Sequence, residues 1–147
     1  HLCRSANKVG WVMTALLVCL ALLQSRPVKD RAESLQLCRQ IATQAETRGL
    51  NPALPVALAY HESSMTRHAV SRVGALGPLQ VMPRYIKCDA SQRCLIKTGL
   101  DIFEYWGRRY RDPTEIVAHY NGGNRPGKRS YRWARAVVAL SKRIGGE

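Results

Sequence analysis

The sequence is poor in acidic residues: its 147 residues include 10 aspartates and glutamates against 23 lysines and arginines. The resulting net charge of +13 at neutral pH is spread along the chain rather than confined to a tail. A positive field of this size favours polyanionic partners, which include nucleic acid, anionic membrane surfaces and acidic cell-wall polymers. The net charge alone does not distinguish among these three kinds of partner. The length allows one domain with a single core.

The sequence also lacks an apolar run of the length that a membrane-spanning helix needs. Its longest apolar stretch covers residues 9–23, follows Arg4 and Lys8, and precedes the first acidic residue, Asp30. A short run with a basic flank at the start of a chain is typical of a secretory signal peptide. We therefore predict an exported, periplasmic protein.

Small residues near the end of this run suggest where a signal peptidase would cut. Cys19 and Ala21 stand two residues apart, which predicts cleavage after Ala21. An uncleaved anchor in the inner membrane is the alternative. The predicted organisation is a leader or anchor over residues 1–25 and one folded domain over residues 26–147.

Several signatures of other protein classes are missing. His61 and Glu62 look like the start of a zinc-protease helix, but Met65 stands where the second histidine is needed. We predict no metal ion and no cofactor. There is no recognised nucleic-acid-binding motif, and the basic residues are not interleaved with exposed aromatic residues, so no nucleic-acid partner is expected.

The five cysteines fit an oxidising compartment. Cys88 and Cys94 bracket a short polar loop, 89–93, and we expect a disulfide to close it. Cys38 falls on the inward stripe of a predicted helix, where we expect a small buried residue without a partner.

The periodicity of apolar residues predicts helices and no convincing strand, with no internal repeat. The expected fold is all-α, or α with minimal β, in one domain. Residues 63–77 are irregular and are expected to line a cleft, and a short helix is expected to open at Gly77. The main helices are predicted over 30–49, 51–62, 95–110, 112–120 and 130–144. The aromatic residues of 95–110 follow its inward face and are expected to belong mostly to the core.

The stretch that organises the chain is 57–83, in which an apolar helix ends in a carboxylate, Glu62. Apolar neighbours and the negative end of the helix dipole both disfavour ionisation, so we expect the pKa of Glu62 to be raised. A carboxylic acid that stays protonated near neutral pH can protonate the leaving oxygen of a glycoside. The alternative is a solvated glutamate after a helix end.

Three segments together resemble the lytic transglycosylase domain, a family with a goose-type-lysozyme-like fold. They are the Glu62-Ser63 pair, the glycine turn GALGPLQVMP at 74–83 and the AHYNGG element at 118–123. The resemblance covers roughly residues 31–144. Pro78 and His119 depart from the residues that are usual in the family.

The resemblance implies cleavage of the β-1,4 bond between N-acetylmuramic acid and N-acetylglucosamine in peptidoglycan, with 1,6-anhydromuramoyl products. It implies that Glu62 acts alone, first as the acid and then as the base. By the same resemblance, Ser63, Gln80, Tyr120 and Asn121 would bind the glycan or orient Glu62. The predicted architecture is thus a lysozyme-like domain with a catalytic cleft.

Two other functions stay open. One is hydrolytic muramidase activity on the same fold, which needs a second carboxylate to activate water, with Asp89 as the first candidate. The other is a non-catalytic module that binds peptidoglycan or nucleic acid through its basic surface. The short, exported form resembles specialised transglycosylases that open the wall for secretion, conjugation or pilus machinery, whose components are possible partners.

Overall fold

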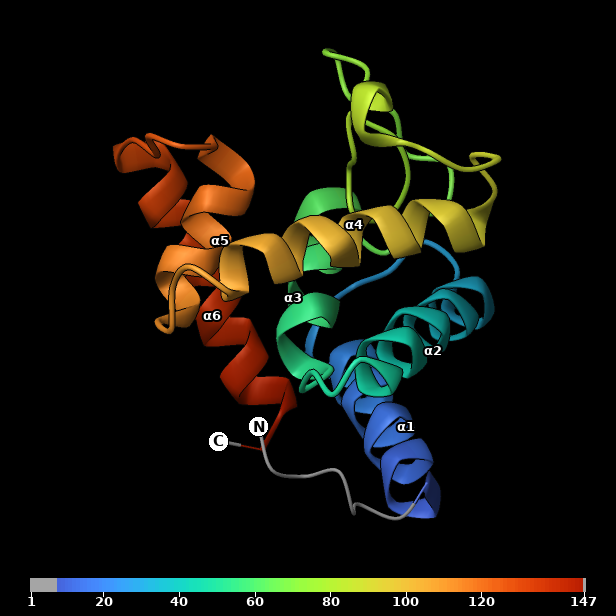
Figure 1. Cartoon of the computed structure of the whole chain (residues 1–147). Helices are drawn as coiled ribbons and strands as arrows, with labels where there is room; N and C mark the ends of the chain where they lie inside the picture. Colours follow the sequence, from blue (N-terminus) through green and yellow to red (C-terminus); the bar gives the residue numbers. More distant parts are fainter. Residues whose placement is uncertain (1–7, 147) are drawn as a thin grey trace.

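The computed structural model describes residues 8–146, which form six α-helices and one 3₁₀ turn (Figure 1). The helices are α1 (Lys8–Ser25), α2 (Arg31–Thr47), α3 (Ala53–Ser63), α4 (Gln92–Gly107), α5 (Pro113–Gly122) and α6 (Lys128–Ile144), with the 3₁₀ turn η1 (Pro83–Tyr85) before α4. No strand forms within residues 8–146; two isolated bridges, Val70–Leu76 and Leu76–Val81, occur between α3 and α4. The predicted all-α fold is confirmed.

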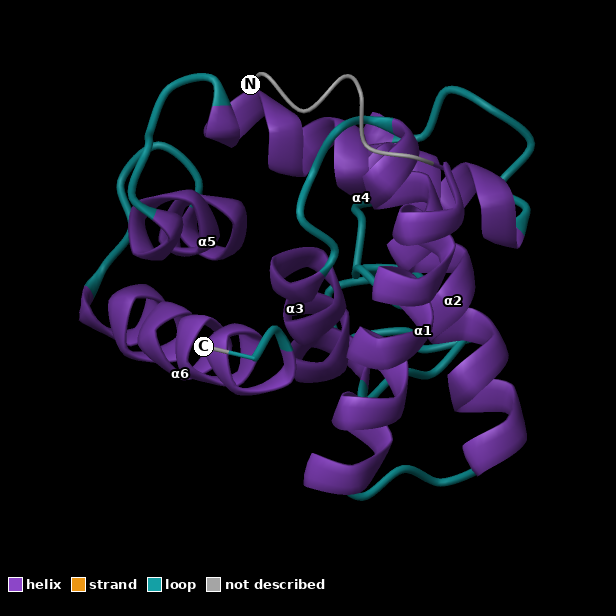
Figure 2. Ribbon diagram, turned by 90° about the horizontal axis from the view of Figure 1, so that it is seen from below, coloured by secondary structure: helices purple, strands orange, loops and turns teal. Residues whose placement is uncertain are grey.

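Helix α3 runs through the middle of the molecule. It contacts α1, α2 and α6, and Figure 2 shows it between the α1–α2 pair and the α5–α6 pair. Such a position requires a helix that is apolar on every side. Residues Val56, Ala57, Leu58 and Ala59 meet this requirement, because all four are fully buried. The C-terminal residues of α3 therefore follow directly on fully buried residues of the core.

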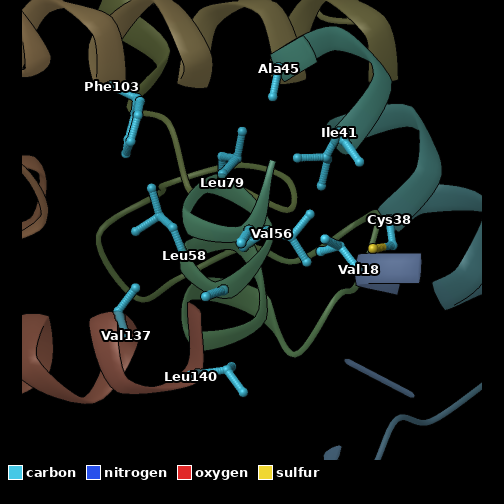
Figure 3. Close-up of a cluster of buried hydrophobic side chains, with 14 of the residues drawn as sticks. Val18, Cys38, Ile41, Ala45, Val56, Leu58, Leu79, Phe103, Val137 and Leu140 are labelled. Carbon is cyan, nitrogen blue, oxygen red and sulfur yellow. The ribbon is translucent and has the colours of Figure 1, made fainter. Parts of the chain in front are cut away.

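The core is shared by all six helices of the described chain and by two loop residues, Met65 and Leu79. Figure 3 shows Leu79, from the segment between α3 and α4, pointing at the α3 side chains Val56 and Leu58. Val137 and Leu140 of α6 complete this layer from the other side. Burying a large apolar side chain contributes roughly 1.5–3 kcal/mol, so Leu79 anchors the loop firmly against α3.

Side-chain caps begin three helices where the sequence predicts a start. Asp30 accepts a hydrogen bond from the Glu33 amide at 3.0 Å, and Asp112 accepts one from the Thr114 amide at 2.9 Å. Asn51 also caps its helix, at 3.0 Å from the Ala53 amide, although α3 begins after Pro52 and not at it. These bonds satisfy amides that have no partner within the helix.

The predicted short helix at Gly77 is wrong. Leu76 and Val81 exchange two backbone hydrogen bonds, of 2.8 and 3.0 Å, across the turn. Their amides and carbonyls are committed to this bridge, so a helix cannot begin there. The turn needs glycine at position 77, where φ is +77° and a Cβ would lie 2.9 Å from Leu95 Cδ1.

Helix α1 packs into the core. Ala15, Val18 and Leu22 are buried, and Cys19 forms a disulfide with Cys38 of α2. Cys38 is buried as expected, but the prediction that it has no partner is wrong. Apolar residues at 15, 18, 19 and 22 follow helical spacing, which is also the pattern of an ordinary core-facing helix.

No helix in the described part of the chain is long and apolar enough to cross a membrane. Export and cleavage stay predictions. Cleavage after Ala21 would divide α1, remove Cys19 and leave Cys38 without its partner.

Candidate active site

Glu62 occupies the last turn of the buried helix α3. The helix ends just after it, because Ser64 takes a left-handed conformation with φ of 55°. Among the described residues no group donates a hydrogen bond to the Glu62 carboxyl, so little stabilises a negative charge there. Burial alone raises the pKa of Glu62 to about 8. The carboxyl is therefore protonated at neutral pH and can donate a proton.

A groove of about 670 Å³ contains three of the four predicted binding residues, whereas Glu62 is not among its lining residues. Its lining comprises Gln80, Val81, Met82, Arg84, Tyr85, Thr98, Asp101, Ile102, Tyr105, Trp106, Arg108, His119, Tyr120, Asn121, Gly123 and Asn124. The charge of Glu62 contributes to raising the pKa of Tyr120, so the acid lies close to the groove wall. A cavity of about 750 Å³ along α2 contains none of the motif residues.

Gln80 is held in place by its own amide group. Its backbone is left-handed, with φ of 52°, and its side-chain nitrogen donates to the carbonyls of Ala69 and Gly77 at 3.2 and 2.9 Å. These two bonds use both amide hydrogens. The side-chain oxygen remains available to accept a hydrogen bond from a ligand in the groove.

Tyr120 and Asn121 come from the last turn of α5. The Tyr120 hydroxyl donates to the carbonyl of Leu79 at 2.7 Å and so ties α5 to the loop that carries Gln80. Burial, and secondarily the charge of Glu62, raise the pKa of Tyr120 well above its ordinary value. The Asn121 oxygen accepts a bond from the Ser130 hydroxyl at 2.7 Å, which leaves the amide hydrogens free to donate.

Ser63 has a local role. Its hydroxyl donates to the carbonyl of Ala59 at 3.0 Å and accepts from the amide of Thr66 at 3.1 Å. Both contacts stabilise the end of α3 and the turn that follows it. Contact of Ser63 with a ligand stays a prediction, and the residue does not line the groove.

His119 has a role that the sequence did not predict. The residue is buried, and its Nδ1 donates to the carbonyl of Gly123 at 2.7 Å. Its ring stacks on Tyr110 with centroids 4.3 Å apart and lies 4.8 Å from the ring of Trp106. His119 thereby fixes the turn that presents Asn121. The only sequence signal was its spacing of four residues from Glu115, whose carboxylate lies 3.6 Å from Nε2.

The other candidate carboxylates are engaged or lie elsewhere. Asp101 lines the groove but contacts Arg48 at 2.7 Å and Lys97 at 2.8 Å; burial opposes ionisation, yet these partners lower its pKa. Asp89 lines a different cavity, and hydrogen bonds from the Ser91 hydroxyl and amide lower its pKa. Within the described residues, no group of three histidine, cysteine or acidic side chains could hold a metal ion.

Comparison with known proteins gives one match. The family model described as "Transglycosylase SLT domain" matches residues 39–139, more than half of the chain. The matched region runs from α2 into α6 and includes Glu62, the glycine turn and the end of α5. No significant match was found among curated proteins or among solved structures.

Proposed function

Since the chain belongs to the transglycosylase SLT domain family, whose members act on peptidoglycan, we propose that it cleaves glycan strands as a lytic transglycosylase with Glu62 as its acid and base. The observation that carries the proposal is the half-buried Glu62 carboxyl close to Tyr120 of the groove, with a pKa of about 8 and no hydrogen-bond donor among the described residues. A group of this kind is a proton donor at neutral pH.

In the first step Glu62 gives its proton to the oxygen of the β-1,4 bond between N-acetylmuramic acid and N-acetylglucosamine. The bond from that oxygen to the muramoyl C1 breaks, and the N-acetylglucosamine side leaves as an alcohol. Positive charge develops at C1, where the neighbouring N-acetyl oxygen can stabilise it. Glu62 is now a partly desolvated carboxylate with no hydrogen-bond donor among the described residues, which makes it a stronger base than an ordinary glutamate.

In the second step the carboxylate of Glu62 takes the proton of the muramoyl 6-hydroxyl. The 6-oxygen bonds to C1 and closes a 1,6-anhydro ring, so no water is consumed and Glu62 regains its proton. The attacking hydroxyl belongs to the same sugar and is held at a high effective concentration. One carboxyl group is sufficient for both steps.

The groove residues support binding of N-acetylated sugars. The free oxygen of Gln80 can accept from an acetamido N–H, and the free amide hydrogens of Asn121 can donate to an acetamido carbonyl or a hydroxyl. Tyr120 offers an apolar ring face in the groove while its hydroxyl stays bonded to Leu79. Ser63 would act by stabilising the end of the helix that carries Glu62.

Hydrolysis is the weaker candidate. A hydrolase needs a base that can activate water on the opposite side of the sugar ring. Among described residues, Asp101 is the one carboxylate that lines the groove, and it is occupied by Arg48 and Lys97. Asp89 lies in another cavity.

We further propose that the protein works outside the cytoplasm, in the periplasm, where it opens the wall locally for a secretion, conjugation or pilus apparatus. Two disulfides, Cys19–Cys38 and Cys88–Cys94, support an oxidising compartment. The link to a particular machine rests on the resemblance of the domain, with its small loop closed by Cys88 and Cys94, to specialised members of the family.

Digestion of purified peptidoglycan followed by mass analysis tests the reaction. An anhydro product is lighter than the hydrolytic product by one water. We expect anhydromuropeptides to dominate. Products with free reducing ends would exclude the intramolecular step and make Asp101 and Asp89 the first carboxylates to mutate.

A further inference from the structure

Two arginines line the groove, and the one acidic residue among its lining residues is neutralised by other partners. Arg84 and Arg108 both line the groove and are exposed. Asp101, which also lines it, is paired with Arg48 and Lys97 and cannot balance these charges. The groove therefore carries two guanidinium groups in excess.

Neither guanidinium has an acidic partner among the described residues. The guanidinium of Arg84 lies over the ring of Tyr85, 4.9 Å from its centre. The side chain of Arg108 forms no hydrogen bond or ion pair with any other residue of 8–146, and its backbone amide caps α4. Free guanidinium groups present several donors in a plane and suit carboxylates or phosphates.

Two exposed tyrosines line the groove. Tyr85 is 49% exposed and Tyr105 is 40% exposed, whereas Phe103 and Trp106 of the same helix as Tyr105 are buried. The guanidinium of Arg109 lies over one face of the Tyr105 ring, 3.6 Å from its centre, and leaves the other face for a ligand. Aromatic rings of this kind offer flat apolar surfaces to sugar rings.

Tyrosine faces beside free guanidinium groups match a ligand that joins a sugar chain to carboxylates. Peptidoglycan has this chemistry, because short peptides with free carboxylates hang from the lactyl groups of its muramoyl residues. We propose that Arg84 and Arg108 bind the carboxylates of these stem peptides, so that the enzyme selects peptide-bearing glycan over bare glycan. The inference rests on the proposed function and adds a substrate preference to it.

The groove geometry limits which steps the two arginines affect. They line the groove with Gln80 and Asn121, but they are not the proton donor and have no contact with Glu62. They should therefore act on binding and leave the chemical step unchanged. Their contribution should fall with ionic strength, because exposed ion pairs are screened by salt.

The test uses one glycan preparation in two forms, with stem peptides and after removal of the peptides by an amidase. Wild type is compared with the double variant Arg84→Gln/Arg108→Gln. The matched control is Arg132→Gln/Arg135→Gln, which removes the same charge from an exposed surface on α6 outside the groove. Rates are measured at low and at high salt.

We expect wild type to cleave peptide-bearing strands with about tenfold higher kcat/KM than bare strands. The groove variant should lose most of this preference through KM, keep its kcat, and cleave bare strands within about twofold of wild type. High salt should reduce the preference of wild type, and the control variant should behave as wild type.

Equal loss on both substrates, or no loss on either, would overturn the assignment of the two arginines. Binding of both strand forms to Glu62→Gln and to the triple variant that also lacks both arginines provides a readout that needs no turnover. If wild type cleaves neither form yet binding to Glu62→Gln depends on Arg84 and Arg108, the proposed reaction fails while the peptide-binding surface stands. If binding shows no preference, the surface assignment fails whether or not cleavage occurs.

Discussion

The end of α3 and the loop closed by Cys88 and Cys94 each carry a carboxyl group, and the two groups have opposite properties. Glu62 ends a buried helix, receives no hydrogen bond from any described residue, and has its pKa raised to about 8. Asp89 lies exposed in the loop and accepts a hydrogen bond from the Ser91 amide at 3.0 Å, and its pKa is lowered. At neutral pH the Glu62 carboxyl therefore keeps its proton, whereas the Asp89 carboxyl is ionised.

The difference shows that burial and nearby hydrogen-bond donors set the pKa of a carboxyl group, and so decide whether it can transfer a proton to a substrate. An exposed carboxylate with hydrogen-bond donors is stable as an anion and has little reason to exchange a proton with a substrate. A carboxyl surrounded by apolar residues is a proton donor before bond cleavage and a reactive base after it.

The largest effect is expected on catalysis from Glu62→Gln. The amide keeps the size of the side chain but has no proton to give, so cleavage of peptidoglycan should fall by at least about a thousandfold. Asp89→Asn is the matched control in the cysteine loop and should retain wild-type turnover within about twofold. Near-normal turnover of Glu62→Gln, or a comparable loss in Asp89→Asn, would reverse the roles assigned to the two groups.

The next largest effect is on stability, from removal of either disulfide. Cys19–Cys38 closes a loop of 19 residues and Cys88–Cys94 one of 6, so loop entropy predicts losses of about 3 and about 2 kcal/mol. Alanine is the suitable replacement, because serine would bury a hydroxyl in the core at Cys19 and Cys38. Denaturant midpoints of Cys19→Ala/Cys38→Ala and Cys88→Ala/Cys94→Ala give the comparison.

Enzymatic activity gives a second measurement on the disulfide variants. The loop variant should keep its activity at temperatures where it is folded, because Asp89 and its neighbours lie outside the groove. A stability of Cys19→Ala/Cys38→Ala equal to that of wild type would mean that α1 is not joined to the domain in solution.

Most of the fold follows from the sequence, because apolar spacing and the caps Asp30, Asn51 and Asp112 act locally. Glu62, Gln80, Tyr120 and Asn121 were predicted through the resemblance, since periodicity does not bring residues so far apart in the chain together. The sequence did not predict that α1 packs into the core, because a signal peptide and a core helix share the same apolar composition; the predicted leader stays untested.

The sequence did not predict the turn at Gly77 or the role of His119, because both depend on tertiary contacts. The turn at Gly77 depends on a bridge between Leu76 and Val81, which competes with helix formation. The role of His119 depends on Tyr110, Trp106 and Gly123 meeting around one ring, and only the folded chain shows this.

A smaller effect is expected on the pH dependence of stability. The folded pKa of Glu62 is about 8, above its ordinary value of 4.5, so the folded state holds the proton more tightly than the unfolded state. Wild type should therefore lose stability as the pH rises from about 4.5 to 8, and Glu62→Gln should not. The variant should match wild type at pH 4 and exceed it by at least about 1 kcal/mol at pH 8.5. Parallel curves for the two proteins would contradict the raised pKa.

The most direct measurement is a carboxyl-carbon NMR titration of the protein labelled at glutamate, with the Glu62 resonance assigned by its absence in Glu62→Gln. The chemical shift of Glu62 should move with a midpoint near pH 8, well above the ordinary glutamate value of 4.5. A midpoint near 4.5 for Glu62 would mean that it is ionised at neutral pH, and the buried proton donor on which the catalytic assignment depends would not exist.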